Sequence, residues 1–260
     1  MLVGLLTDFG DRSNFVGVMK GVILKINPYA KLVDITHKIS FGSVREALFL
    51  LYKSYSYFPE GTIFVVVVDP QVGSERKALA IKTKNYYFVG PDNGVLSWAV
   101  FEDGVEKIIE VKNKKYFLKN ISSTFHGRDI FAPVAAYISR GVKIEKLGKR
   151  IKRIKKLDFP QVKIKKDTLK GEILYIDSFG NLVTNIKKDA FLNFVKNKKF
   201  IAILNGKKIR KLHNFYSQAK SGIPFFIEGS FSFLEISLYL SSAKEYFKAK
   251  EEDTVIIKRL

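Results

Sequence analysis

The sequence predicts an α/β protein with two domains. The N-terminal domain should be Rossmann-like, with a parallel or mixed sheet covered by helices, because short apolar runs alternate with segments of helical period over the first 140 residues. The smaller C-terminal domain should be mostly β and barrel-like, because short candidate strands separated by turn signals follow residue 166. With 260 residues, 47% of them hydrophobic, the chain is long enough to bury a core in each domain.

The elements of the first domain follow from these runs in order. We expect strands at 2–6, 32–35, 63–68, 78–82 and 86–89, and helices at 14–26, 43–57 and 129–140. Residues 63–68 are too apolar to leave one face in water, so they should form a central strand. Pro133 falls in the first turn of the last helix, where its missing N–H is tolerated.

A basic, proline-containing segment at 151–166 is expected to link an N-terminal domain, 1–150, to a C-terminal domain, 167–260. In the second domain we expect strands at 171–176, 200–204, 224–227 and 254–258. One short helix is expected there, at 242–247.

The composition excludes several classes of protein. Without cysteine there is no disulfide, thiol nucleophile or Cys-ligated metal, which fits an intracellular chain. No apolar run approaches the roughly 20 residues of a membrane span, so we expect a cytoplasmic protein without a membrane partner. His, Asp and Glu show no metal-binding spacing, and no phosphate-loop or dinucleotide motif occurs, so no metal or cofactor is expected.

The net charge of +20 raises the alternative of a nucleic-acid partner. Residues 141–170 contain 12 Lys or Arg and 3 Asp or Glu, so much of the excess positive charge lies in this one segment. Elsewhere Lys is scattered among Ile and Val, without the interleaved aromatic residues of a base-stacking groove. The charge therefore favours a solvated, thermophile-like surface over a nucleic-acid site.

Polar residues end several of the predicted strands, where ligands bind in open α/β sheets. Asp69 follows four valines, so it should be partly buried and paired with Arg76 or His126. Structural interpretations stay open for the other polar residues of these loops. Asp8 and Asp92 also suit turns, Asp129 suits a helix N-cap, and His37 and His126 also suit packed or solvated positions.

Six motifs occur in order along nearly the whole chain. They are TDFG at 7–10, DITH at 34–37, VDPxVGSxR at 68–76, GPDNG at 90–94, FHGRDIFAP at 125–133 and DSFGNLVTNI at 177–186. Together they resemble the S-adenosyl-L-methionine (SAM) hydroxide adenosyltransferases, relatives of the fluorinases and chlorinases.

The resemblance implies an enzyme that splits SAM into adenosine and L-methionine with water or hydroxide. It implies that the water is held and activated by Asp69, Arg76 and His126. It further implies substrate contacts from Asp8 to the ribose hydroxyls, Asp177 near the methionine amino group, Phe179 and Asn181 to adenine, and Ser230 to the methionine carboxylate. The resemblance also implies a homotrimer, with each site between the N-terminal domain of one subunit and the C-terminal domain of the next.

The implied chemistry agrees with these residue types. A sulfonium leaves as a neutral thioether, so the main requirement is a nucleophile held in line with the C5′–S bond. Asp69 is expected to orient Arg76 and His126, and which of the three takes the proton stays open. His126-Gly127 stands where halogenating relatives have a Tyr-Ser type pair, which favours hydroxide over halide.

The chain also departs from the family pattern. Gln71 stands where the family commonly has Gly, and Phe231 stands where some relatives have an Arg for the methionine carboxylate. Substrate affinity is therefore expected to differ from that of the family, and two other functions remain as hypotheses. One is a catalytically inactive sensor that binds SAM or adenosine, and the other is a basic RNA-binding protein.

Overall fold

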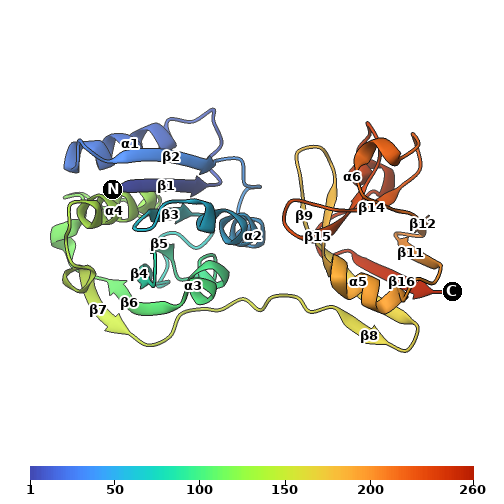
Figure 1. Ribbon diagram of the computed structural model, residues 1–260. Helices are drawn as coiled ribbons and strands as arrows, with labels where there is room; N and C mark the ends of the chain where they lie inside the picture. Colours follow the sequence, from blue (N-terminus) through green and yellow to red (C-terminus); the bar gives the residue numbers. More distant parts are fainter. The chain divides into compact units, whose positions relative to one another are not determined.

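Two sheets organise the chain, one in each of two units (Figure 1). The computed structural model describes residues 1–260, and the units are Met1–Asp158 and Phe159–Leu260. The division falls inside the basic segment 151–166. No helix is both long enough and apolar enough to cross a membrane.

The first unit is built on a seven-stranded mixed sheet of order β2-β1-β3-β5-β4-β6-β7. Its parallel half consists of β2 (Lys31–Thr36), β1 (Leu2–Thr7), β3 (Ile63–Val67) and β5 (Tyr87–Pro91). Each remaining strand is antiparallel to the one before it in the sheet: β4 (Ala78–Thr83), β6 (Val105–Val111) and β7 (Gly148–Ile151). Every residue of β3 is buried, as the apolar run at 63–68 predicts for a central strand.

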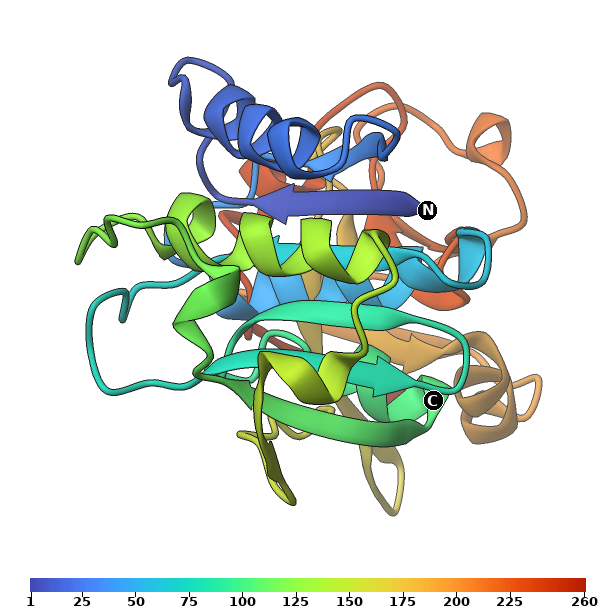
Figure 2. The ribbon, with the colours of Figure 1, turned by 90° about the vertical axis from the view of Figure 1, so that its left-hand side faces the viewer.

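Helices cover both faces of this sheet. On one face, α1 (Phe15–Ile26) packs against α4 (Ala132–Ser139), and on the other, α2 (Val44–Ser54) packs against α3 (Ser97–Asp103). Alternate residues of β3 enter the two cores: Val65 faces the α1 and α4 layer, and Val66 faces the α2 and α3 layer. In Figure 2, α4 (yellow-green) runs in about the same direction as β1 (dark blue). The predicted Rossmann-like fold class is confirmed for this unit.

The start of the last helix differs from the expectation. A π-helical turn, η3 (Gly127–Phe131), precedes α4, so the helical segment begins two residues before 129. Asp129 lies inside this segment and is fully buried, so it is not the N-cap of the helix. The short 3₁₀ turns of this unit are η1 (Tyr55–Tyr57), η2 (Lys114–Tyr116) and η4 (Ile144–Leu147).

The second unit holds a nine-stranded sheet of order β12-β11-β16-β9-β10-β15-β14-β13, with β8 paired to β9. The strands are β8 (Lys163–Lys165), β9 (Thr168–Ile176), β10 (Leu182–Lys187), β11 (Phe200–Leu204), β12 (Lys207–Ile209), β13 (Leu212–His213), β14 (Phe225–Glu228), β15 (Phe233–Ser237) and β16 (Thr254–Arg259). The curled sheet encloses one apolar core, and the mostly β character predicted for this part is confirmed.

The prediction of one helix in this unit is wrong. Besides α6 (Ala243–Phe247) and the 3₁₀ turn η5 (Tyr216–Gln218), the unit contains α5 (Lys188–Val195). The helix α5 buries Phe191, Phe194 and Val195 against the core. Its helical period extends over only eight residues among many lysines, too few for the pattern to stand out in the sequence.

Candidate active site

Two aspartates follow adjacent parallel strands of the first sheet. Asp8 comes directly after β1, and Asp69 comes two residues after the end of β3. Both line a cavity of about 390 Å³, together with His126, which directly precedes the π-helical turn η3. The carboxyl edge of the parallel strands therefore carries the pocket, which is where open α/β sheets bind ligands.

A buried guanidinium joins Asp69 to His126. Arg76 donates from Nε to both carboxylate oxygens of Asp69, at 3.1 and 2.9 Å, and its Nη2 lies 2.5 Å from Oδ2. The side chains of this pair are each only 5% exposed. The same Nη2 lies 2.7 Å from Nδ1 of His126. Asp69 therefore orients Arg76 directly, and it acts on His126 through Arg76.

This contact fixes the protonation of His126. A guanidinium has only donors, so Nδ1 of His126 must accept, and the neutral ring then carries its proton on Nε2. Burial lowers the pKa of His126, and the charge of Arg76 lowers it further against the opposing effect of Asp69 and Asp129. His126 is therefore a neutral ring that offers an N–H donor from Nε2.

The buried Asp129 stabilises the segment before His126 by hydrogen bonding. Its carboxylate accepts from the backbone N–H of Ser122 at 2.7 Å and from Arg128 at 2.6 Å. The loop that carries Arg76 packs against the same segment at Gly73, whose φ is +82°, and a Cβ there would lie 2.4 Å from the carbonyl oxygen of Ser123. The glycine of the VGS sequence is thus required by a close backbone approach.

The DITH motif stabilises the loop that carries Asp8 through hydrogen bonds. His37 Nδ1 lies 2.9 Å from the hydroxyl of Thr7, and His37 Nε2 lies 3.0 Å from Asp34 Oδ1. The carbonyl of His37 also accepts from the N–H of Gly10 at 2.8 Å. The packed interpretation of His37 is therefore correct, because both of its ring nitrogens face groups of the fold.

Asp8 itself is half-buried and faces the cavity. Its Oδ2 accepts from the N–H of Gly42 at 2.9 Å. Burial raises the pKa of Asp8, with a smaller contribution from the charge of Asp69, while the Gly42 hydrogen bond opposes the shift. Asp8 thus keeps acceptor capacity on a side chain that lines the cavity.

Sequence reasoning missed the aromatic wall of this cavity. The rings of Phe9, Phe15 and Phe125 pack edge to face, with centroids 5.0 to 5.6 Å apart, and Phe41 adds an exposed ring. Phe9 and Phe125 lie in the TDFG and FHGRDIFAP motifs, so their positions were visible in the sequence although their grouping was not. The wall offers an apolar surface beside the charged groups.

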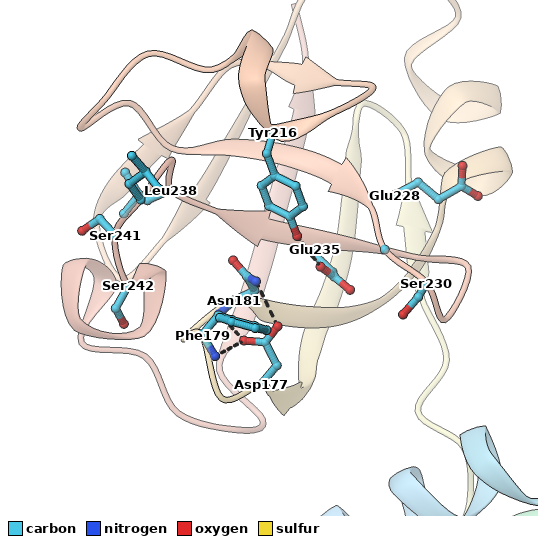
Figure 3. Close-up of a pocket in the computed structure, with 12 residues that line it drawn as sticks. Asp177, Phe179, Asn181, Tyr216, Glu228, Ser230, Glu235, Leu238, Ser241 and Ser242 are labelled. Carbon is cyan, nitrogen blue, oxygen red and sulfur yellow. Dashed lines mark hydrogen bonds between the residues drawn. The ribbon is translucent and has the colours of Figure 1, made fainter.

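In the second unit, Asp177, Phe179, Asn181 and Ser230 line one pocket of about 690 Å³ (Figure 3). Asp177 Oδ1 accepts from the N–H groups of Phe179 and Asn181, at 2.9 and 2.8 Å, and Oδ2 accepts from the Asn181 amide at 2.9 Å. Asp177 thereby builds the turn that presents the Phe179 ring, which is 79% exposed.

Sequence reasoning also missed Glu235 and Tyr216, which line the same pocket. Glu235 lies on β15 and is only 6% exposed, and the Tyr216 hydroxyl donates to its Oε2 at 3.3 Å. Burial, and then the charge of Asp177, raise the pKa of Glu235 to about 7. An acid inside the apolar sequence FLEIS was the available signal.

The predicted residues thus form two groups. Asp8, Asp69, Arg76 and His126 come together in the first unit, and Asp177, Phe179, Asn181 and Ser230 come together in the second.

Comparison with known proteins matches both parts of the chain to one family. Residues 3–148 match SAM hydroxide adenosyltransferase N-terminal domains, and residues 171–256 match the C-terminal domains of the same family. The chain belongs to the SAM hydroxide adenosyltransferase family. The resemblance carried by the six motifs is confirmed.

The chain has relatives that match nearly its whole length. It is 35% identical over 268 residues to the (R)-S-adenosyl-L-methionine hydrolase of Methanocaldococcus jannaschii, covering 98% of this chain and 95% of the relative. Similarity to a fluorinase of Actinoplanes is lower, at 26% identity over 214 residues and 72% of each chain. The crystal structure of an uncharacterized conserved protein from Thermotoga maritima is similar with a TM-score of 0.92 at 40% identity, covering 99% of this chain and 100% of that chain.

We predict that replacing Arg76 by Met raises the pKa of His126. The substitution removes the cationic neighbour, while burial and the Asp69 charge remain. Nitrogen-15 NMR of the three histidines, with His37→Gln and His213→Gln used for assignment, would measure the pKa and tautomer of His126. An unchanged pKa, or a wild-type ring with its proton on Nδ1, would contradict the geometry described above.

Proposed function

We propose that this family member hydrolyses SAM to adenosine and L-methionine by in-line attack of hydroxide at C5′. The observation that carries the proposal is the buried array of Asp69, Arg76 and His126 at the end of β3. SAM is the substrate, and the proposed reaction uses no cofactor. The hydrolase names of full-length relatives support the same reaction and indicate the R configuration at sulfur.

In this mechanism the array binds and stabilises the nucleophile. The Nε2–H of His126 donates to the oxygen of a bound water, while the nearby charge of Arg76 favours the loss of a proton to solvent. His126 is not the base, because its Nδ1 is occupied by Arg76. The hydroxide oxygen forms a bond to C5′, the C5′–S bond breaks, and its electron pair neutralises the sulfonium as methionine leaves.

Proposed contacts hold the rest of the substrate. The carboxylate of Asp8 accepts hydrogen bonds from the ribose diol, and the exposed Phe179 ring and the Asn181 amide bind adenine. Ser230 contacts the methionine carboxylate, and Asp177 shapes the pocket around the amino group. Fixing C5′ against the bound nucleophile contributes to rate by positioning alone.

The proposed homotrimer brings the two groups of residues together. We infer that the first unit of one subunit and the second unit of the next complete each site. The proposal rests on the family resemblance and on the division of the candidate residues between two units.

The reaction is tested by incubating the purified chain with (R)-SAM, with and without chloride, and separating the products by chromatography. We expect equal amounts of adenosine and methionine, independent of chloride, and no 5′-chloro-nucleoside. Arg76→Met and His126→Ala should each lower kcat by about 10²- to 10³-fold, because the first removes the charge that stabilises the nucleophile and the second removes the hydrogen-bond donor to it. Arg140→Met, at an exposed arginine after α4, is the matched control. Full activity in both site variants would refute the proposed roles.

Subunit mixing tests the shared site. Arg76→Met inactivates the first unit and Asn181→Ala impairs the second, so co-expressed subunits with different tags should form mixed trimers in which some sites have two intact halves. We expect the purified mixed oligomer to recover a measurable fraction of the wild-type rate at low SAM concentration. Activity no higher than the sum of the two variants, in an oligomer shown to contain both tags, would contradict a site shared between subunits.

A further inference from the structure

The loop between β2 and α2 contributes two residues to the first-unit cavity, Phe41 and Gly42. The ring of Phe41 is 95% exposed, and the N–H of Gly42 donates to Oδ2 of Asp8 at 2.9 Å. The loop also approaches the segment after Asp69, because a Cβ at Gly42 would lie 3.8 Å from Cβ of Pro70. The position of this loop therefore decides where the Gly42 donor lies relative to Asp8.

Glu46, in the first turn of α2, is a buried acid that contacts this loop. Its Oε2 accepts from the N–H of Ser40 at 2.8 Å. In a capping box, an acid at this helix position accepts from the N–H of the N-cap residue. Here the N-cap is Ser43, whose N–H donates instead to the carbonyl of Ser40 at 2.8 Å. Glu46 therefore reaches three residues beyond the N-cap, across the turn that contains Phe41 and Gly42.

Both ends of the turn at 40–43 are fixed to α2. At its end, the hydroxyl of Ser43 accepts from the N–H of Glu46 at 3.3 Å, and at its start the carboxylate of Glu46 holds Ser40. Between them, Gly42 has a φ of +70°, which glycine adopts without strain, and its carbonyl accepts from the N–H of Val44 at 2.9 Å. Because α2 packs on the sheet through its buried residues, the turn is anchored to the core of the first unit.

The Gly42 donor acts on both the orientation and the charge of Asp8. It uses one of roughly four acceptor positions of the carboxylate, which leaves the others for a ligand in the cavity. Burial raises the pKa of Asp8 and the charge of Asp69 adds to the shift, whereas the Gly42 hydrogen bond lowers it. Displacement of Gly42 would therefore free the carboxylate to rotate and favour its protonation.

We propose that Glu46 is a positioning residue for recognition of the ribose hydroxyls of SAM: by holding Ser40, it keeps the N–H of Gly42 on the Asp8 carboxylate. The inference rests on the proposed function, in which Asp8 accepts from the ribose diol. Glu46 lies behind the turn and acts on the substrate only through Gly42 and Asp8. It therefore determines the preference for ribose over deoxyribose, and the nucleophile array determines the turnover rate.

The decisive comparison uses Glu46→Ala with (R)-SAM and with its 2′-deoxy analogue. The variant should raise the KM for SAM by about tenfold and change kcat by less than about threefold, because the lost contact serves the ground state and the transition state alike. Wild type should prefer SAM to the analogue by about tenfold in kcat/KM, and the variant should lose most of this preference. Glu46→Gln, whose amide oxygen can still accept from Ser40, should retain it.

Asp103 offers a matched control in the same unit. Its carboxylate also accepts from a loop backbone, the N–H of Asn85 at 3.0 Å, and from the Asn85 side-chain amide at 2.7 Å. Asn85 precedes β5, so this contact lies at the edge of the sheet opposite to Asp8. Asp103→Ala should lower Tm, as Glu46→Ala does, without changing the preference for ribose. A loss of preference in both variants would trace it to general destabilisation and contradict the inference.

The pKa of Asp8 gives a readout that needs no turnover. Carbon-13 NMR of the carboxyl groups, with Asp8→Asn used for assignment, would measure it in the free protein. The pKa should be higher in Glu46→Ala than in wild type, because the hydrogen bond that favours the ionised form is lost while burial and the charge of Asp69 remain. In Glu46→Gln it should keep the wild-type value.

The outcomes distinguish this inference from the proposed function. If wild type forms no adenosine from SAM, the proposed function fails, and the pKa of Asp8 still tests the link from Glu46 to Asp8. If wild type is active but Glu46→Ala keeps the wild-type KM, ribose preference and Asp8 pKa, Glu46 is not a positioning residue. If Glu46→Ala does not fold, Glu46→Asp takes its place with the same expected changes, because its shorter side chain withdraws the carboxylate from Ser40.

Discussion

The buried guanidinium of Arg76 determines the electrostatics of the proposed nucleophile site. It neutralises Asp69 through a two-point contact and holds Nδ1 of His126 with a further N–H. Because a guanidinium keeps its proton, it fixes the tautomer of His126 and places a permanent positive charge beside the cavity. Loss of Arg76 would leave the buried carboxylate of Asp69 unpaired. A substitution at Arg76 therefore removes the positive charge and disturbs the geometry of the site at the same time.

The parallel half of the sheet gives this contact its precision. Asp8 and Asp69 follow neighbouring strands, and Asn93, after β5, donates to the carbonyl of Val68 at 2.8 Å, directly before Asp69. Polar contacts hold the loops in place, as those around Asp129 and His37 show. Side chains supported in this way stay close to one geometry, which positioning catalysis requires.

The sequence predicts those strands, helices and site residues that long or strongly apolar patterns mark. The valine run before Asp69 indicates a central strand and a partnered acid, and both are observed. Short elements such as α5 are missed, because eight residues give too few turns of helical period. The N-cap interpretation of Asp129 is wrong, because the π-helical turn places this residue inside the helical segment. Glu235 is missed because its importance comes from residues distant in sequence, Tyr216 and Asp177, that leave it buried without a cation.

Isotope incorporation tests the central claim, attack by a water-derived oxygen at C5′, most directly. A single turnover of (R)-SAM by the purified protein in water enriched in oxygen-18, followed by mass spectrometry of both products, would locate the new oxygen. The account predicts one heavy oxygen in the 5′-hydroxyl of adenosine and none in methionine. Adenosine without the label, or a labelled methionine, would contradict hydrolysis at C5′.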